Sequence, residues 1–262
     1  MPADLAGNLS SAVYNAGAGT LTVTMLPFDG SPSGAAYNRQ STLDVGSYQA
    51  FDLQENGASR RYLALFQQNG NVWAGAVATE YRFANKYGGT IYGRADVYSG
   101  PTTGIASYQG SYAAVLTVPI NSSGTPAGPI RIAGTATLNV DFNQQLVEGQ
   151  VTNRHVVDSA NLAGQSATLA ALSGGMANVE LKSGGLSSGT FHGDVTDPGG
   201  NKLGTYGGVV AAGSASAPGS AVAGVLVFTP TDAGQTPNYT EYGAMVLPLK
   251  CYSTAGSSTT CP

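Results

Sequence analysis

The chain has 262 residues, of which only 10% are charged, and it carries a formal net charge of −4. This length suffices for one large or two modest β domains. Lys and Arg form no basic cluster, so the composition argues against a nucleic-acid partner, which would require grouped positive charge. No apolar run of about 18 residues occurs, so no segment is expected to cross a membrane as a helix.

Residues 1–98 are predicted to form a separate unit of β-strands. Apolar–polar alternation and β-forming residues predict strands at 20–26, 48–53, 61–67 and 72–78. Asn69-Gly70, between the last two strands, is the strongest short signal for a hairpin. The Gly- and Tyr-rich residues 87–94 are expected to be the crossover to the rest of the chain.

The remaining chain carries short strands that glycines interrupt. Such strands are predicted at 104–110, 134–142, 146–153, 189–195, 204–210 and 221–228. The sequence Asp197-Pro198-Gly199-Gly200-Asn201 is typical of a turn between antiparallel strands, so the last three strands should form a meander. Glycines inside strands suit the tight curvature of a small closed barrel. No convincing helix is predicted, and the one candidate, 160–172, fits a strand or loop equally well.

In order and rough spacing these runs resemble the eight-stranded barrel of transferrin-binding protein B-like surface proteins of Gram-negative bacteria. The resemblance covers about residues 100 to 249 and rests on glycine–aromatic strand patterns. It implies an all-β chain of one lobe: a handle-like β domain at 1–98, a β-barrel at 99–250 and a C-terminal tail at 251–262. It also implies a non-enzymatic protein at the bacterial surface or outside the cell, which captures a host protein, heme or another nutrient carrier.

Cys251 and Cys261 lie close together in a tail rich in Ser, Thr and Gly. A disulfide closing this tail would stabilise the fold by about 2–3 kcal/mol through loop entropy and would indicate an oxidising compartment. Two free thiols that bind metal are the alternative, but no third ligand lies nearby. The chain starts without the charged and apolar regions of a signal peptide, so export is inferred from composition and from the resemblance.

Catalysis finds little support in the sequence. Gly185-Leu186-Ser187-Ser188-Gly189 matches the pattern of a nucleophile elbow, yet that motif requires a following helix, whereas a strand is predicted here. Only His192 comes later in the chain to complete a triad. No phosphate-binding loop or zinc-protease motif occurs either. We therefore expect no catalytic site, no metal site and no assured cofactor, with heme as the one candidate ligand group.

The two histidines are the candidate heme ligands. His192 shares one face of its strand with Asp194, opposite Phe191 and Val195, so it should point to solvent if those two apolar residues fill the barrel. His155 lies where a strand runs into a loop, a place where binding residues are common. A purely structural position is the competing interpretation for both.

The tyrosines, 14 in number, include a cluster just before the barrel. Tyrosine is common at recognition surfaces because it is amphipathic and loses little entropy on binding. A partner-binding surface at the junction of the two units would comprise Tyr81, Arg82, Tyr87, Tyr92 and Arg94. In the competing interpretation these residues only cover β faces and the seam. The long loops 119–131 and 211–220 are further candidates for binding.

Two functional classes therefore remain open, a binding protein and a structural or adhesive module of the cell surface. A ligand held inside the barrel is a weaker third possibility, since eight strands enclose just enough room for side chains. The expected inward set looks like a packed core: Ile105, Leu138, Val140, Phe142, Val151, Phe191, Val195, Tyr206 and Phe228. The sequence leaves the ligand, any membrane anchor and the oligomeric state open.

Overall fold

The structure is a computed structural model of the 262-residue chain. It describes residues 1–25, 34–54, 61–79, 87–117, 129–157, 172, 175–230, 239–254 and 261. Tyr81 and Arg82, most of the loop 119–131 and all but the last residue of 160–172 lie outside these ranges. Among the described residues no helix is long and apolar enough to cross a membrane.

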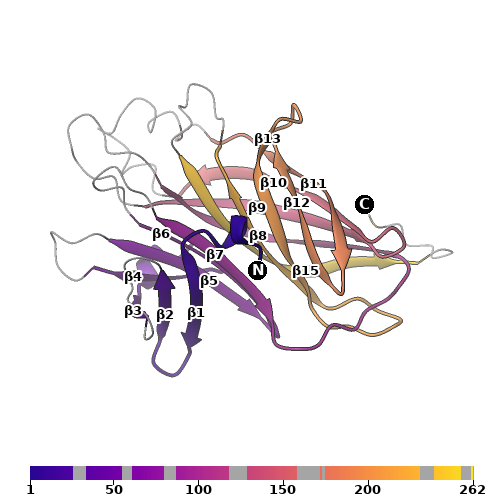
Figure 1. Ribbon diagram of the computed structural model, residues 1–262, viewed down its shortest axis with the longest axis horizontal. Coiled ribbons are helices and arrows are strands. Elements are labelled where there is room, and N and C mark those ends of the chain that lie inside the picture. Colours follow the sequence, from indigo (N-terminus) through magenta and orange to yellow (C-terminus); the bar gives the residue numbers. More distant parts are fainter. Residues whose placement is uncertain are drawn as a thin grey trace.

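The N-terminal half forms one antiparallel sheet of seven strands in chain order, here called the handle sheet (Figure 1). A short helix, α1 (Ala3–Ala6), precedes it, and a turn of 3-10 helix (Ser41–Leu43) precedes its fourth strand. The strands are β1 (Leu9–Asn15), β2 (Thr20–Met25), β3 (Ala35–Arg39), β4 (Gln49–Leu53), β5 (Tyr62–Asn69), β6 (Val72–Thr79) and β7 (Gly88–Arg94).

The C-terminal half closes into an antiparallel barrel of eight strands, because the last strand pairs with the first. The fold is therefore all-β, a smaller sheet followed by an eight-stranded barrel, as the sequence predicted. The barrel strands are β8 (Ile105–Thr117), β9 (Ile130–Asp141), β10 (Leu146–Val156), β11 (Val179–Ser187), β12 (Thr190–Thr196), β13 (Lys202–Val210), β14 (Ala221–Phe228) and β15 (Thr240–Ser253).

The expected crossover at residues 87–94 is wrong, because these residues form β7 and pair with β6 from Gly88 to Arg94. The glycines serve close packing instead of a connection. A Cβ on Gly93 would lie 2.4 Å from the indole ring of Trp73, and one on Gly88 would lie 2.3 Å from the ring of Tyr242. Each glycine thus makes room for an aromatic ring.

Side chains fill the inside of the barrel and form the barrel core. The predicted inward residues are all buried except Ile105, which is 40% exposed. The expectation for Ile105 is wrong because its neighbours Ala106 and Tyr108 point inward, which places Ile105 on the outer face.

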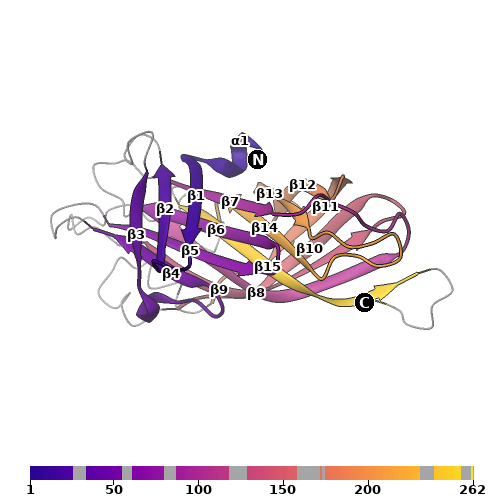
Figure 2. The same ribbon diagram turned by 90° about the horizontal axis from the view of Figure 1, so that it is seen from below.

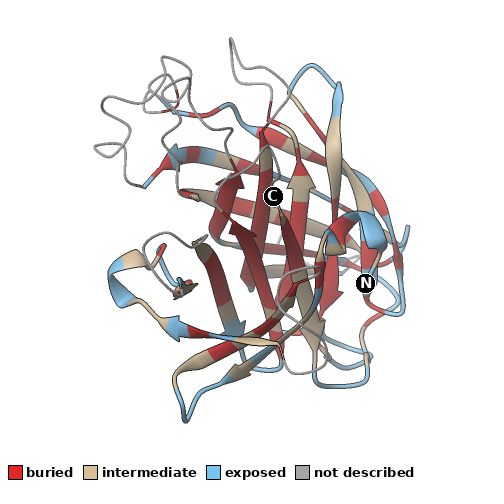
Figure 3. Ribbon diagram, turned by 60° about the vertical axis from the view of Figure 1, so that its left-hand side comes forward, coloured by how far each residue is buried: buried red, intermediate tan, exposed pale blue. Residues whose placement is uncertain are grey.

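A second core, the interface core, lies between the handle sheet and the outer wall of the barrel. Strands β5, β6 and β7 lie across β14, β15 and β8 (Figure 2). Small residues such as Ala76 and Ala223 let the two layers approach closely. Strand β14 is consequently buried on both faces, with Leu226 in the barrel core and Val225 in the interface core. In Figure 3 several neighbouring strands are coloured as buried along almost their whole length.

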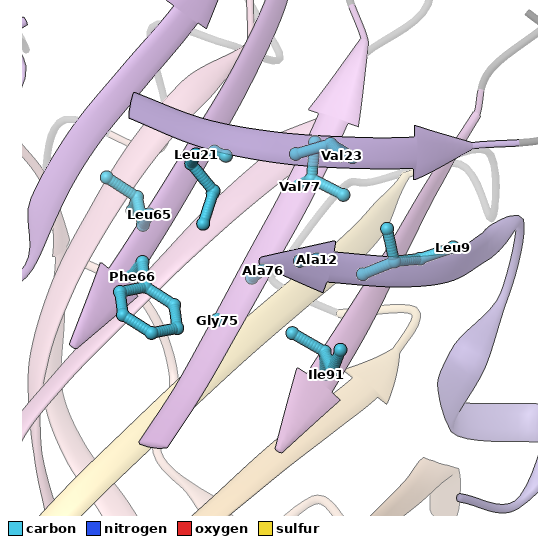
Figure 4. A pocket seen from close by; sticks show the side chains of 11 residues that line it. Leu9, Ala12, Leu21, Val23, Leu65, Phe66, Gly75, Ala76, Val77 and Ile91 are labelled. Atoms are coloured by element: carbon cyan, nitrogen blue, oxygen red, sulfur yellow. The ribbon is translucent and has the colours of Figure 1, made fainter. Parts of the chain in front are cut away.

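A third core, the handle core, lies where β1 and β2 fold over the far face of β5, β6 and β7. Leu9, Val23 and Phe66 belong to it. A small apolar cavity of about 10 Å³ remains inside this core (Figure 4). Its volume would admit a single water at most, and its walls offer no polar side chain, so it is not a ligand site.

Candidate functional site

Arg94, at the end of β7, connects the handle sheet to the barrel. Its guanidinium donates to the carbonyls of Ser188, Gly189 and Val210 at 2.8, 3.0 and 3.1 Å. The same group lies 5.1 Å from the ring centre of Tyr98, which in turn covers Gly189. Burial lowers the pKa of Arg94, but its ordinary value is so high that the charge is kept. Arg94 thus holds the hairpin between β11 and β12 against the handle sheet.

His192, on β12, faces away from the barrel core, as expected once Phe191 and Val195 are seen to fill it. Its Nε2 lies 3.0 Å from the Asp4 carboxylate of α1, and both side chains are more than two-fifths exposed. Partial burial by itself would raise the pKa of Asp4. Hydrogen bonds from the side chains of Thr205 and His192, with the charge of His192, outweigh burial and lower that pKa.

The short helix α1 is held at the seam between sheet and barrel. Leu5 is fully buried in the interface core, and its carbonyl accepts a hydrogen bond of 2.7 Å from the Thr90 hydroxyl. Tyr92 packs against the same core from β7. Burial raises the pKa of Tyr92, and the nearby charge of Asp4 raises it further.

The structure therefore gathers three of the predicted site residues, Tyr92, Arg94 and His192, in one region. Together with Asp4 and Tyr98 they form what we call the junction surface. Its side chains come from α1, β7, the segment after β7, and β12. It combines partly buried aromatic rings with an exposed carboxylate and imidazole.

Tyr87 and the loop 211–220 were further candidates for binding. Tyr87 is half-buried and packs against the handle core, where its backbone pairs with Thr79. The loop 211–220 is tied to its surroundings by the N–H of Gly213, which donates to the Ser99 carbonyl at 2.6 Å. The Tyr108 hydroxyl also donates to the Gly219 carbonyl at 3.0 Å.

His155 lies on the outer face of β10, and a β-bulge explains why. Between Thr152 and His155, strand β10 has one residue more than β9, and Asn153 adopts a positive φ of 54°. The extra residue reverses the alternation of faces, so Arg154 and Val156 are buried while His155 is exposed. The His155 Nδ1 lies 2.9 Å from the Asn153 carbonyl oxygen.

The inward-facing Arg154 forms a buried ion pair with Glu241 of β15, which the sequence analysis missed. The two side chains are 1% and 0% exposed. The hydroxyl of Tyr112 donates to the same carboxylate at 2.8 Å, and the guanidinium of Arg154 lies 5.0 Å from the ring centre of Phe228. Arg154 also donates to the carbonyl of Ala177. Side chains of β8, β10 and β15 thus meet in one polar cluster inside an apolar core, next to the Phe228 ring of β14.

The two histidines do not come together. The register pairs His192 with Gly185, and Gly185 with Leu146 at the start of β10, whereas His155 lies near the other end of that strand. Within the described ranges no group of three or more His, Cys, Asp or Glu side chains could hold a metal ion. A heme bound here would therefore have one histidine ligand at most.

A polar groove of about 310 Å³ lies over the outer face of β9, β10 and β11. Glu148 accepts a hydrogen bond of 3.0 Å from the Ser183 hydroxyl, and Glu180 pairs with Lys182. The amide oxygen of Asn139 is buried there without a hydrogen-bond partner in the described part of the chain. The groove offers hydrogen-bonding groups but no aromatic ring for stacking among its lining residues.

The sequence resembling a nucleophile elbow forms a β-hairpin turn. Ser187 pairs with Thr190, and Ser188 and Gly189 between them have φ values of 48° and 68°. Two residues with positive φ are typical of the tight turn that joins antiparallel strands. The prediction that a strand follows this motif is confirmed.

The disulfide between Cys251 and Cys261 is confirmed, with the two Cα atoms 5.6 Å apart. It joins the end of β15 to the second last residue of the chain. An oxidised pair of this kind persists in secreted and cell-surface proteins.

No protein-family model and no curated protein matches the chain. Among solved structures it is similar to intact Ap-TbpB with its N and C lobes, at 12% identity over 93% of this chain and 44% of that one, with a TM-score of 0.43. A mutant of the vaccine antigen transferrin-binding protein B from Haemophilus parasuis Hp5 matches at 9% identity over 92% and 42%, with a TM-score of 0.44.

A structure described as a surface lipoprotein matches at 12% identity over 94% of this chain and 99% of that one, with a TM-score of 0.40. The chain spans less than half the length of the transferrin-binding proteins it matches and nearly all of the surface lipoprotein. The strand pattern in the sequence resembles this same kind of protein, the transferrin-binding protein B-like surface proteins.

Proposed function

We propose that this chain is an exported, non-enzymatic binding protein that captures a partner protein on its outer surface. The filled barrel carries this proposal. Phe191, Tyr206, Leu226 and other side chains pack into one core inside the described part of the barrel and occupy the space that an internal ligand would need. A partner must then bind outside, where the barrel serves as a rigid support for surface residues.

The junction surface is the proposed contact for the partner. Tyr92 and Tyr98 are partly buried and already ordered, so they would lose little conformational entropy on binding. His192 and Asp4 beside them are exposed and can exchange hydrogen bonds with a partner. Aromatic rings surrounded by polar groups are the usual composition of the energetically dominant part of a protein interface.

The proposed partner is a protein that carries iron or heme, and the proposed location is the bacterial surface or the extracellular space. We base this choice on the names of the similar structures, which are transferrin-binding protein B and a surface lipoprotein. The C-terminal disulfide supports export independently. Free heme is the alternative ligand, through either His155 or His192.

The test measures binding of the purified chain to immobilised transferrin and heme-carrying serum proteins, alongside an absorbance titration with free heme. We expect saturable binding to a carrier protein and no Soret shift that depends on a histidine. A Soret shift lost in His155→Ala or in His192→Ala would instead identify a heme carrier and name its ligand. Absence of binding to every carrier protein would reject protein capture.

A second candidate is a structural or adhesive module of the cell surface. The specific observation in its favour is that, in the described part of the chain, no strand pairing closes the handle sheet between β1 and β7, whereas the barrel is closed. A free strand edge can pair with another chain.

A further inference from the structure

The polar groove over the outer face of β9, β10 and β11 has the dimensions of a binding site. Its volume of about 310 Å³ lies at the lower end of the range for pockets that hold small ligands. Polar side chains reach it from each strand: Asn139 from β9, Glu148 from β10, and Glu180 and Lys182 from β11. The groove shares no residue with the junction surface.

A β-bulge in β11 forms part of the groove wall. Beyond Leu181, strand β11 has one residue more than its neighbours β10 and β12. The extra residue directs two consecutive side chains, Lys182 and Ser183, to the outside, and both are exposed. From inside the barrel, the Tyr206 hydroxyl lies 2.7 Å from the carbonyl oxygen of Val147 and 2.8 Å from that of Lys182. The core thus holds the bulge in place.

Asn139 provides the groove with a hydrogen-bond acceptor that the protein does not use. Its amide oxygen is buried and has no partner in the described part of the chain. Only one other side-chain atom of the described residues shares this property, the hydroxyl oxygen of Thr196. Thr196 pairs with Glu180, so its side chain lies on the same outer face of the sheet. Buried polar groups are nearly always bonded, so this face calls for a partner from outside the chain.

The charged groups of the groove also leave acceptors in excess. The Glu148 carboxylate accepts one hydrogen bond, from the Ser183 hydroxyl at 3.0 Å, and one Glu180 oxygen pairs with the Lys182 ammonium. Among the described residues, the second oxygen of each carboxylate accepts no hydrogen bond. Two carboxylates and one ammonium give the lining a net charge of −1. A matching ligand therefore supplies N–H donors and positive charge.

We propose that this groove binds the guanidinium group of an arginine side chain in a partner polypeptide. Glu148 and Asn139 are paired directly across β10 and β9, which places their Cβ atoms about 5 Å apart. A guanidinium presents five N–H donors in a planar fork and can bond both of these acceptors at once. Glu180 is paired with Gln150 and lies diagonally opposite Glu148, roughly 7–8 Å away, so its charge attracts the same cation.

Other ligand classes fit these groups less well. The negative charge of the lining repels an anion, and it also repels the free carboxylate of arginine as a single amino acid. A Ca²⁺ ion requires six to eight oxygen ligands, whereas the described residues contain no cluster of three acidic, His or Cys side chains. An ammonium group is a point charge, which does not match a pair of neighbouring acceptors as a planar fork does.

The test titrates the purified chain with N-acetyl-arginine amide and follows backbone amides by heteronuclear NMR. We expect saturable shifts for residues 137–139, 148–150 and 180–183, and none with N-acetyl-citrulline amide, the neutral isostere. Glu148→Gln removes the charge but keeps an acceptor for Ser183, and it should weaken binding about five- to tenfold. The matched control is Asp96→Asn. Asp96 is likewise exposed and accepts a hydrogen bond from a neutral side chain, that of Asn71, outside the groove. It should leave binding unchanged.

Absence of saturable shifts at these residues would overturn the proposal. So would equally tight binding of the citrulline compound or of N-acetyl-lysine amide, or an affinity of Glu148→Gln equal to that of the wild type. Circular dichroism of Glu148→Gln checks that the variant is folded. Because the groove and the junction surface share no residue, these measurements test arginine binding separately from partner capture at the junction surface.

Discussion

Arg154 and Glu241 place two opposite charges inside the barrel, with almost no exposure to water. Isolated charges would be very unfavourable there, and the pair is tolerated because its hydrogen bonds reach Tyr112 and the Ala177 carbonyl. The bulge at Asn153 is what directs Arg154 inward. A local irregularity of the backbone therefore determines which charge enters the core.

Replacing Glu241 by Gln should destabilise the fold by about 3–5 kcal/mol, because the buried charge of Arg154 loses its counter-charge. Denaturant unfolding monitored by circular dichroism measures this change. The double variant Arg154→Met/Glu241→Leu removes both charges and should recover most of the lost stability. A Glu241→Gln variant as stable as the wild type would show that the pair is not buried as described.

At the scale of single residues, the sequence could predict which face of a strand a side chain occupies, but it could not predict the β-bulge in β10. Strict alternation correctly placed Phe191 and Val195 inside and His192 outside. It could not place Arg154, because one extra residue in β10 reverses the pattern after Thr152. The partner Glu241 lies 87 residues away, and such a distant pair leaves no local signal.

Among the elements, Tyr48 joins the handle sheet to the barrel wall most directly. It precedes β4, is fully buried, and inserts its hydroxyl where β8 and β15 are not directly bonded. The hydroxyl accepts from the Val246 N–H at 2.8 Å and donates to the Ser111 carbonyl at 3.2 Å. Pro248 lies in the same stretch of β15 and has no N–H to donate. The sequence of β15 is therefore compatible with a gap in the hydrogen-bond ladder to β8.

Tyr48→Phe should destabilise the protein by about 1–3 kcal/mol, because it leaves the buried Val246 N–H without its partner. Tyr252→Phe is the matched control, since the Tyr252 hydroxyl donates to the Thr103 carbonyl at 2.9 Å in an exposed setting. The control should change the free energy of unfolding much less. Equal effects in denaturant unfolding would contradict the inserted position of Tyr48.

The turn between β12 and β13 should make stability depend on acid pH. Hydrogen bonds from the Asn201 side chain and backbone lower the pKa of Asp197 below its ordinary value. A carboxyl with a lowered pKa in the folded state stabilises above its unfolded pKa and loses this effect as pH falls through its folded pKa. The difference in melting temperature between wild type and Asp197→Ala should therefore shrink below about pH 4.

Asn201→Ala keeps the Asp197 carboxylate and removes its side-chain donor. This variant should show a weaker dependence on acid pH than the wild type. A melting-temperature difference between wild type and Asp197→Ala that stays constant down to about pH 2 would contradict the account of the turn.

The strands that the sequence predicted are those with clear alternation or a clear turn. The hairpin at Asn69-Gly70 and the turn at Asp197–Asn201 are both confirmed. Strands β1, β3, β11 and β15 escaped prediction. Strand β1 begins with a bulge, and β3 pairs with β4 at only a few positions. Strand β7 was misassigned because its glycines, which accommodate rings of Trp73 and Tyr242, resemble those of a connection.

On the scale of the whole molecule, the chain has three apolar cores. One lies inside the barrel, one between the barrel wall and the handle sheet, and one on the far face of that sheet. Strands β6 and β14 are buried on both faces, which makes sheet and barrel one packed unit. The resemblance of the strand order to transferrin-binding protein B-like proteins predicted both the handle sheet and the barrel. The sequence could not show how β7 and α1 bring Tyr92, Arg94 and His192 together, because that depends on the packing of sheet against barrel.

The buried tyrosines should produce a steep transition at alkaline pH. Burial raises the pKa of Tyr242 to about 12, and it also raises that of Tyr48, Tyr108, Tyr112 and Tyr206. An acid whose pKa is raised on folding stabilises fully below its unfolded value, near 10 for tyrosine, and loses this effect as pH rises further.

Spectrophotometric titration of tyrosinate, together with circular dichroism, checks this expectation. The buried set should titrate only above pH 10, the ordinary value of tyrosine, and together with loss of structure. If all 14 tyrosines ionised near pH 10 while the fold persisted, the packing of the cores described above would be wrong.

The central claim is that a partner protein binds the junction surface outside a filled barrel. The most direct measurement compares the affinity of a carrier protein for the wild type, Tyr92→Ala, His192→Ala and His155→Ala. His155→Ala is the matched control, an exposed histidine near the other end of the barrel strands. We predict that the first two variants weaken binding by about tenfold or more, and that the control does not. Weakening by His155→Ala alone, or equal binding by every variant, would contradict the account.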